Sequence, residues 1–497
     1  MSVRVSYGIT RPTAGAFLVV GLSGLLGCGG SGSGGGLVGD DRALESAMET
    51  VFSYGTAFGE VSEMLGDEVQ LGFDDQGQLY ILDANSFRVL LVDGEGSFVR
   101  QFGREGDGPG ELSRPRHMVV QPDGSVAIFD ARTRAFTLFD PEGQYSGDVR
   151  VAMGFSQTEQ QVRSAGQDRL AVLGLGSDFT IPGQGARAGG ATATTTQGRG
   201  GARGGQQRGG GGQQDRGGRG GQPDTIASTW PMRLIDLSTS TSAVFHEAWR
   251  PQLAEIPESA PNQGRGGRGG RGGLNQFTDP NNVGFLPSIL FDGFPNGSVA
   301  VVDSSDYSID IVAPSGQIAQ VLTRNIPARP ATEETLELDR VRRITNIETG
   351  APTNLQGPPQ VQGGGFGGRA GRGGDGGGRG GRGGGGPELD PQAQIEAAIE
   401  SELERIETLP YAPEIPVIKN IKADPSGRLW VERIPESLVG PGPIDVFSLE
   451  TGYLGTFPAG EFSLPEVFGP DGLAAFIERD EYDVPIVVVR RLGPPFE

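Results

Sequence analysis

The sequence contains a single cysteine, Cys28, and only two histidines, His117 and His246, among 497 residues. One cysteine excludes a disulfide within the chain and any metal cluster built from several thiolates. Aromatic residues make up 7% of the chain and apolar residues 35%. Both fractions are modest for one continuous globular domain, so part of the chain is expected to lie outside a hydrophobic core.

The net charge of −21 combines two opposite compositions. Three tracts, 184–222, 263–273 and 363–386, hold 40 of the 86 glycines, 13 arginines and two acids, which gives them a charge of +11. The rest of the chain therefore carries −32. An acidic body repels phosphates, which argues against nucleic acid as a partner.

The tracts themselves resemble arginine–glycine segments of RNA-binding proteins. Such segments usually combine arginine with aromatic side chains, but Phe366 is the single aromatic residue in the three tracts. We interpret the tracts as low-complexity loop insertions at 184–222, 263–273 and 350–387.

The first 27 residues have the pattern of a bacterial secretion signal. Ala16–Leu26 is an apolar run that is too short to span a bilayer. It ends in Leu25-Leu26-Gly27-Cys28, which resembles the lipobox of bacterial lipoproteins. The resemblance implies cleavage before Cys28, attachment of lipid to that cysteine, and a flexible tether over 28–49.

The residue after Cys28 is Gly29 rather than aspartate. By resemblance to proteobacterial lipoprotein sorting, this favours the outer membrane, with the protein facing the periplasm or the cell surface. We therefore expect a lipid-anchored protein of the cell envelope. An ordinary secretion signal with an incidental cysteine is the alternative.

A strand–turn–strand cassette recurs along the chain. Each copy has an apolar segment, a turn rich in Asp, Pro and Gly, and an alternating apolar strand. The copies are Phe73–Asp83, Val120–Asp130, the degenerate Ser164–Leu173, Phe291–Asp303, Ala423–Glu432 and Phe468–Glu478. Where no tract intervenes, successive turn glycines are 42 to 47 residues apart, which is the length of a four-stranded propeller blade.

Six cassettes predict an all-β fold, a six-bladed β-propeller of four-stranded blades over residues 50–492. Thr50–Gly55 has no cassette of its own, so we expect it to close the ring by pairing with Pro485–Arg491, with Val51 and Tyr54 packed against the sheet. A helical insertion is predicted over 331–409, with helices at Thr332–Ile344 and Asp390–Leu409 on one propeller face.

Two segments of the first blades resemble NHL-repeat propellers. Gly103–Val120 contains a Gly-Pro-Gly-Glu segment before a proline and an inner strand, and Ile128–Gly143 contains a strand ending in Asp, a polar loop and an Arg-containing strand. Asp83–Val89 repeats the second element. The close resemblance covers about 85 residues and implies the propeller fold.

We expect a binding or scaffold protein, since propeller ligands commonly contact the loops of one face. The loop after the first cassette and the loop Gly103–Pro115 should lie on the same face. The candidate binding residues on these loops are Asp83, Asn85, Arg104, Glu105 and Asp107. The partner would be a protein, a peptide or a glycan, and no cofactor is predicted.

The rival hypothesis is a metal-dependent hydrolase or lyase. Lactonase-like six-bladed propellers hold a divalent metal with oxygen ligands in the central channel, and the repeated Asp83, Asp130 and Asp303 could converge there. Alternatively, each aspartate caps the loop that follows it by accepting backbone N–H bonds. Lyases on NHL-type propellers bind zinc through several histidines, a site that His117 and His246 cannot reproduce.

Overall fold

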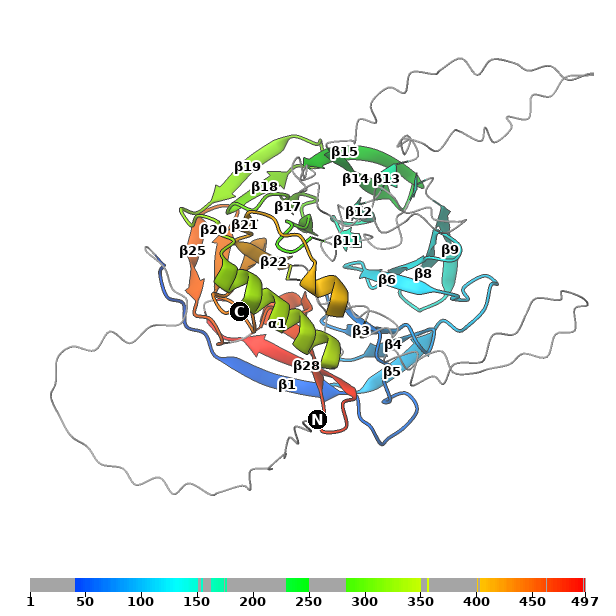
Figure 1. Ribbon diagram of the computed structural model, residues 1–497. Coiled ribbons are helices and arrows are strands. Elements are labelled where there is room, and N and C mark those ends of the chain that lie inside the picture. Colours follow the sequence, from blue (N-terminus) through cyan, green and yellow to red (C-terminus); the bar gives the residue numbers. More distant parts are fainter. Residues whose placement is uncertain are drawn as a thin grey trace, which may run out of the picture. The chain divides into compact units, whose positions relative to one another are not determined.

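The computed structural model describes residues 41–150, 153–154, 162–173, 175–176, 229–249, 283–349, 355–356, 400, 403–461, 463–494 and 496. All of them belong to the compact unit Gly35–Glu497. Six four-stranded antiparallel sheets are arranged as the blades of a propeller (Figure 1). This confirms the predicted six-bladed β-propeller.

The blades follow each other in chain order. Blade 1 contains β2 (Val69–Phe73), β3 (Leu79–Asp83), β4 (Arg88–Val92) and β5 (Phe98–Phe102), and blade 2 contains β6 (Pro115–Val120), β7 (Val126–Asp130), β8 (Ala135–Phe139) and β9 (Tyr145–Arg150). Blade 3 contains β11 (Val162–Ser164), β12 (Arg169–Leu173), β14 (Thr229–Asp236) and β15 (Thr241–Trp249), and blade 4 contains β16 (Leu290–Gly293), β17 (Val299–Val302), β18 (Ser308–Val312) and β19 (Ile318–Thr323). Blade 5 contains β22 (Ile418–Ala423), β23 (Arg428–Arg433), β24 (Ile444–Ser448) and β25 (Gly452–Phe457), and blade 6 contains β26 (Val467–Phe468), β27 (Leu473–Arg479), β28 (Pro485–Leu492) and β1 (Met48–Tyr54).

The inner strands surround the central axis. Each one contacts the inner strand of the next blade, in the order β2, β6, β11, β16, β22, β26 and back to β2. The hydrophobic core lies between adjacent blades, and Trp430 of blade 5 illustrates this by stacking on Phe457 and packing against Phe468 of blade 6. Each blade thus buries both faces of its sheet against its neighbours.

The tight turn after each inner strand requires glycine. The six turn glycines have φ between +72° and +89°, a region that residues with a Cβ seldom adopt; they are Gly77, Gly124, Gly166, Gly297, Gly427 and Gly472. In blade 6 a short 3₁₀ turn, η2 (Pro470–Gly472), forms this connection. The cassette pattern in the sequence therefore records a conformational requirement of the backbone.

The ring is closed by β1, which is the outer strand of blade 6. β1 pairs antiparallel with β28, so the predicted pairing of Thr50–Gly55 with Pro485–Arg491 is confirmed. The prediction for Val51 was wrong, because the register shifts between Thr50 and Phe52 and leaves Val51 exposed. Phe52 and Tyr54 are the buried side chains of the closing strand.

Residues 41–44 fasten the chain to blade 5 before it reaches blade 6. Ala43 forms a parallel bridge with Thr456, and the Asp41 carboxylate accepts bonds from Arg324 at 2.5 Å and Arg433 at 2.8 Å. The Asp445 carboxylate, 3.0 Å from Arg324, completes this buried cluster. The N-terminal part of the described chain therefore joins two blades.

The low-complexity tracts lie outside the described residues, in three connections between described elements. The first lies between β12 and β14 of blade 3, the second between β15 and β16, and the third after helix α1 (Glu333–Thr349). Helix α1 confirms the helix predicted at Thr332–Ile344 and extends beyond it. Of the helix predicted at Asp390–Leu409, the described part is helical at 403–407, with Ile406 and Leu409 buried as expected, and the remainder lies outside the described residues.

Two short strand pairs accompany the blades. β10 (Met153–Gly154) pairs with β13 (Leu175–Gly176), and β20 (Arg329–Pro330) pairs with β21 (Glu414–Ile415). The second pair brings the two ends of the helical insertion together. No helix in the described part of the chain has the length and hydropathy needed to cross a membrane.

Candidate functional site

The two faces of the propeller carry different connections. In an antiparallel blade, the loop after the second strand and the loop after the outer strand leave at the same end. We call this end the long-loop face; it includes the loops 55–68, 84–87, 103–114, 303–307, 434–443 and 480–484, and the helical insertion. The opposite end, the turn face, carries the tight glycine turns. The predicted binding loops lie on the long-loop face.

Exposed apolar side chains are distributed unevenly between these faces. Fourteen large apolar residues are exposed in the described chain, and seven of them lie on the long-loop face: Phe58, Val61, Met64, Leu338, Val341, Val439 and Tyr482. The other seven lie on the outer strands β1, β5, β9, β15 and β19. Within the described residues the turn face has none. The long-loop face is therefore the face suited to binding.

Four of these residues lie on the two loops 55–68 and 480–484, where blade 6 meets blade 1, and we call them the apolar patch. Phe58 and Val61 are 76% and 75% exposed, and Met64 belongs to the same loop. The Phe58 ring meets Tyr482 of the loop 480–484 edge to face, with 5.1 Å between the ring centroids. Aromatic and aliphatic groups exposed together on rigid loops are typical of a contact surface.

The loop that presents this patch is fixed by a buried arginine. Arg88 donates to the carbonyl of Val61 at 2.9 Å and to that of Met64 at 2.7 Å, and pairs with the Asp83 carboxylate at 3.1 Å. Tyr54 adds a bond to the carbonyl of Ser62. Because Asp83 and Arg88 are buried, they position the patch without contacting a ligand there.

The predicted candidate residues divide into buried and exposed ones. Asp83 is fully buried and accepts the Ser86 N–H, whereas Asn85 is exposed and accepts the Glu68 N–H at 2.8 Å. Both hold the loop geometry. Only Asn85 lies at the surface of the long-loop face.

The other three candidates lie together on the exposed loop 103–114. Arg104 pairs with Glu111 at 2.8 Å, and Asp107 pairs with Arg132 at 2.9 Å. The Gly108 N–H and Arg104 together lower the pKa of Glu111. Glu105 is exposed and forms a backbone bridge to Leu112. A ligand binding to Arg104 or Asp107 would have to replace an existing ion pair.

Two of the three repeated aspartates, Asp83 and Asp130, cap loops. Asp130 accepts the backbone N–H groups of Ser113, Arg114 and Arg132 at 2.7 to 2.8 Å, as the capping interpretation predicts. Asp83 and Asp130 end second strands, and Asp303 directly follows one, so all three are one strand away from the axis. Among the described residues no group of three or more His, Cys, Asp or Glu side chains could hold a metal ion.

The two histidines are far apart in the topology. His117 is on β6, the inner strand of blade 2, and His246 is on β15, the outer strand of blade 3. The two histidines therefore lie on strands of different blades.

Three charged residues that the sequence analysis missed lie on inner strands of successive blades. Arg163 on β11 is 3.6 Å from Asp292 on β16, and the other oxygen of Asp292 accepts the Ala423 N–H at 2.8 Å. Lys422 on β22 is buried and donates to the carbonyl of Glu466 at 2.6 Å. Burial, helped by the charge of Arg163, lowers the pKa of Lys422. An alignment of the cassettes by their turn glycines would have found two of them. Asp292 and Lys422 both stand five positions before the glycine, where blades 2 and 6 have Val119 and Val467. Arg163 stands three positions before Gly166 and gives no such signal.

The helical insertion forms a cap, residues 331–349 and 403–415, over blades 4 and 5. In Figure 1, α1 crosses the front of the propeller. The cap rests on an apolar cluster in which Leu336 and Tyr411 pack against Phe285, Ile434 and Leu438. Arg329, just before it, donates to the carbonyl of Pro435 at 3.0 Å. The long-loop face is thus covered at blades 4 and 5.

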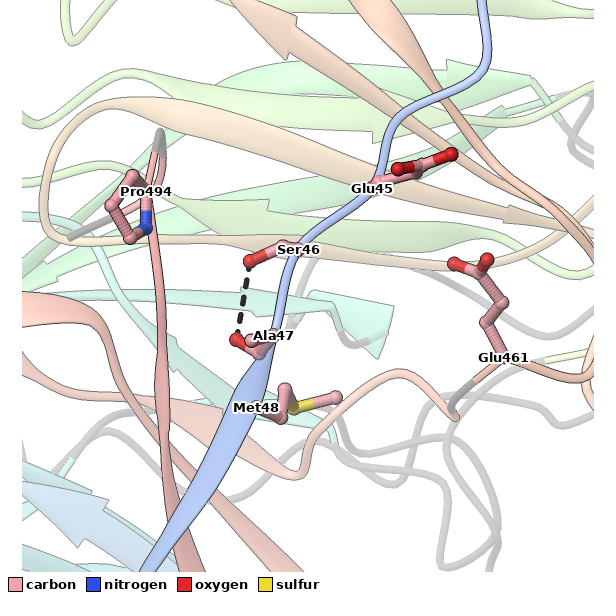
Figure 2. A pocket seen from close by; sticks show the side chains of 6 residues that line it. All are labelled: Glu45, Ser46, Ala47, Met48, Glu461 and Pro494. Carbon is pink, nitrogen blue, oxygen red and sulfur yellow. Dashed lines mark hydrogen bonds between the residues drawn. The ribbon is translucent and has the colours of Figure 1, made fainter.

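A separate open pocket lies on the rim beside the start of β1. It is lined by Glu45, Ser46, Ala47, Met48, Glu461 and Pro494 (Figure 2). Figure 2 shows both carboxylates on one side of the segment 45–48 and Pro494 on the other. Burial and then the charge of Glu45 raise the pKa of Glu461. Two acids and a serine whose hydroxyl bonds to backbone carbonyls do not define a ligand, so we assign no function to this pocket.

Comparisons with known proteins agree with the fold. The family model DUF5128, described as a 6-bladed beta-propeller, matches residues 64–163, which are blades 1 and 2 and the start of blade 3. No curated protein matches the chain.

Three solved structures align with nearly the whole chain. One is a protein from Bacteroides fragilis that is described as an exported protein, and its sequence is 10% identical to this chain. The alignment covers 92% of this chain and 97% of that chain, with a TM-score of 0.39. A DUF4221 family member from Bacteroides vulgatus is 8% identical to this chain, with a TM-score of 0.40. That alignment covers 91% of this chain and 98% of the other. Virginiamycin B lyase from Staphylococcus aureus is 8% identical, with a TM-score of 0.35 over 90% and 99%. We take no function from similarities this low; the six sheets and the family model identify the chain as a six-bladed β-propeller.

Proposed function

We propose that this protein is a lipid-anchored binding protein of the bacterial cell envelope and that the apolar patch on its long-loop face binds a protein or peptide partner. The observation that carries the proposal is the patch of Phe58, Val61, Met64 and Tyr482. Apolar side chains held at the surface lose contact with water when a partner covers them, which favours association.

The surroundings of the patch favour a protein over a glycan. Arg479 lies beside the patch and pairs with Asp67 at 3.4 Å and with Asp483 at 3.5 Å, and all three side chains are exposed. An apolar centre with a charged, water-accessible rim is the usual anatomy of a protein interface. A glycan needs several hydrogen-bond partners, whereas among the four patch side chains the Tyr482 hydroxyl is the one strong hydrogen-bonding group.

The patch is also pre-organised. Arg88 and Tyr54 hold the backbone of the loop 55–68 at three carbonyls, so the loop loses little conformational freedom when a partner binds. Pre-organisation of this kind increases affinity because the ordering cost has been met during folding.

The proposed lipid anchor rests on the lipobox-like sequence Leu25–Cys28. Twelve residues, 29–40, separate Cys28 from Asp41 of the described chain, and a fully extended segment of that length spans about 40 Å. The propeller would therefore stay within about one domain diameter of the membrane. Cys28→Ser should abolish metabolic labelling by a fatty acid and release the protein from membranes. An equally labelled mutant would contradict the anchor.

Site-specific photo-crosslinking tests the binding surface. A photoreactive amino acid at position 58 or 482 should capture a distinct envelope protein in the native bacterium. Position 98 on the outer strand β5 is the matched control, because Phe98 is also an exposed aromatic residue, at 42%. The same products from all three positions, or none from 58 and 482, would show that the patch is not the binding site.

The metal-dependent enzyme remains the alternative, and no contact in the described chain favours it. Asp83 and Asp130 use their carboxylate oxygens on backbone N–H groups and Arg88. Stoichiometric divalent metal in the purified protein, lost on Asp303→Asn, would favour the alternative over binding alone.

A further inference from the structure

The two loops that carry the apolar patch are strongly acidic. Residues 55–68 and 480–484 together contain seven aspartates and glutamates and no lysine or arginine. Two arginines lie close to these loops: Arg479 directly precedes the second loop, and Arg116 is 3.6 Å from Glu68. Counting both arginines against the seven acids leaves a net charge of −5 around the patch.

The arginines nearest to the patch are already paired within the chain. Arg479 is 3.4 Å from Asp67 and 3.5 Å from Asp483, and it donates to the carbonyl of Asp483 at 2.6 Å. Arg88 beneath the patch is buried and pairs with the buried Asp83. A negatively charged partner would therefore have to compete with existing ion pairs.

One glutamate on each loop is unpaired. Glu60 and Glu481 are exposed, and within the described part of the chain neither carboxylate has a hydrogen bond or an ion pair. Glu63 differs, because its carboxylate accepts the Glu60 N–H at 3.1 Å. Glu60 and Glu481 directly precede the patch residues Val61 and Tyr482. Unpaired negative charge therefore borders the apolar patch on both loops.

We propose that the partner segment that covers the apolar patch is basic, with lysine or arginine beside its apolar side chains. This inference rests on the proposed function of the patch and adds the sign of the partner's charge. Opposite charges at the rim of an interface speed association and exclude partners of the same sign. At the rim, Glu60 and Glu481 can pair with a cation while they stay in contact with water, so little desolvation opposes the pairing.

Two other occupants fit the patch less well. An anionic lipid surface attracts basic segments, and the acids around the patch would repel it. The chain's own arginine-rich tracts match the charge, but apart from alanines Phe366 is the single apolar residue in 184–222, 263–273 and 363–386. A separate segment that is both basic and apolar matches the charge and the apolar surface together.

Photo-crosslinking can identify the charge of the partner. Membranes of the native bacterium that hold the full chain with a photoreactive residue at position 58 are irradiated at low salt and at about 0.5 M NaCl, where the screening length falls to roughly 4 Å. Mass spectrometry of the captured segment should show more lysine and arginine than acid, and the higher salt should reduce the yield several-fold. Salt does not weaken a purely apolar contact in this way. A captured lipid, or a neutral or acidic protein segment, would overturn the inference.

A pair of variants tests the two unpaired glutamates. Glu60→Gln combined with Glu481→Gln keeps the side-chain size and should lower the low-salt yield from position 58 about fivefold. Glu95→Gln combined with Glu142→Gln is the matched control, since it neutralises two exposed glutamates in turns of the turn face, and should change little.

The outcomes separate this inference from the function on which it rests. Equal yields from the two double variants would show that the partner does not use the acidic rim, and binding at the patch would still stand. No product from position 58 in any version, at either salt concentration, would refute the proposed function and this inference with it.

Discussion

At the scale of single residues, buried charged side chains of this propeller fix the loops through hydrogen bonds to the backbone. Asp83, Arg88 and Asp130 are each buried, and each bonds to the backbone of a long-loop connection. Their recurrence in the sequence reflects this repeated structural task. Residues that are particular to one loop, such as Phe58, are the ones to which we assign binding.

Replacing Arg88 with methionine should destabilise the protein strongly. The substitution keeps the length of the side chain but leaves the Asp83 carboxylate and the carbonyls of Val61 and Met64 without their buried partner. We expect a loss of about 3 kcal/mol in the free energy of unfolding, measured by denaturant titration. Arg104→Met, which breaks an exposed pair, should cost less than about 1 kcal/mol. Similar losses in both variants would contradict the positioning role of Arg88.

Asp236 makes a pH-dependent contribution to blade 3. Bonds from Ser238 and Thr239 lower the pKa of Asp236 from 3.8 to about 2. Because the folded pKa lies below the unfolded one, this stabilisation is present above pH 3.8 and is lost as the pH falls toward about 2. Asp236 lies at the surface and is partly exposed, so solvent screens the interaction and we expect only about 1 kcal/mol. Between these pH values wild type should lose that much more stability than Asp236→Asn; parallel pH profiles would refute the assignment.

At the scale of elements, the closing strand shows that the two sides of one strand contribute differently to the hydrophobic core. β1 contributes Phe52 and Tyr54 to the core between blades 6 and 1, whereas Val51 falls at the register shift and faces solvent. The alternation in the sequence predicts the strand, but a one-residue irregularity changes which side chains are inside.

Phe52→Ala should therefore cost about 3 kcal/mol of unfolding free energy. Val51→Ala, one residue away on the same strand, should cost less than about 0.5 kcal/mol. Thermal and denaturant unfolding would measure both. A larger effect from Val51 would mean that the register of β1 differs from the one described here.

Helix α1 shows the limit of pattern analysis at this scale. Leu336, Leu338, Val341 and Ile344 suggest an ordinary amphipathic helix, and the helix itself was predicted correctly. The structure buries Asp339 and Arg343 and exposes Leu338 and Val341. Periodicity locates a helix, but its rotation depends on the surface against which it packs, and here that surface includes Tyr411.

At the scale of the whole molecule, the ring is closed twice. β1 joins the two chain ends through backbone pairing with β28. Residues 41–44 attach the same segment to blade 5 through the buried pair of Asp41 and Arg433 and the bridge from Ala43 to Thr456. A pulling force applied through an N-terminal lipid anchor would act on the contacts with blade 5 before it acted on the closing strand β1. Such an arrangement protects the weakest point of a propeller, its seam.

Deleting 184–222 should leave the fold intact. The strands on either side of this insertion, β12 and β14, are neighbours in blade 3, and Leu173 pairs with Met232 near the ends from which the insertion leaves. A shorter loop can join them. We expect little change in the unfolding temperature measured by calorimetry; a fall of more than about 5 °C, roughly 1–2 kcal/mol or more, would show that the tract packs on the propeller.

The sequence by itself determined the blade count, the turn glycines, the strand that closes the ring and the places where tracts are inserted. These features depend on local requirements: positive φ at Gly77 and its equivalents, alternation in strands, and the absence of apolar residues in the tracts. Each can be recognised within a few residues.

Only the tertiary structure decided which residues meet. Phe58 and Tyr482 are 424 positions apart and share one patch, and Arg163, Asp292 and Lys422 come from three blades. Closing the ring sets these distances, and no local pattern contains them because contact between blades depends on every blade in between. Local sequence patterns therefore account for most of the fold of this protein, whereas its candidate sites form only when the ring closes and brings distant residues together.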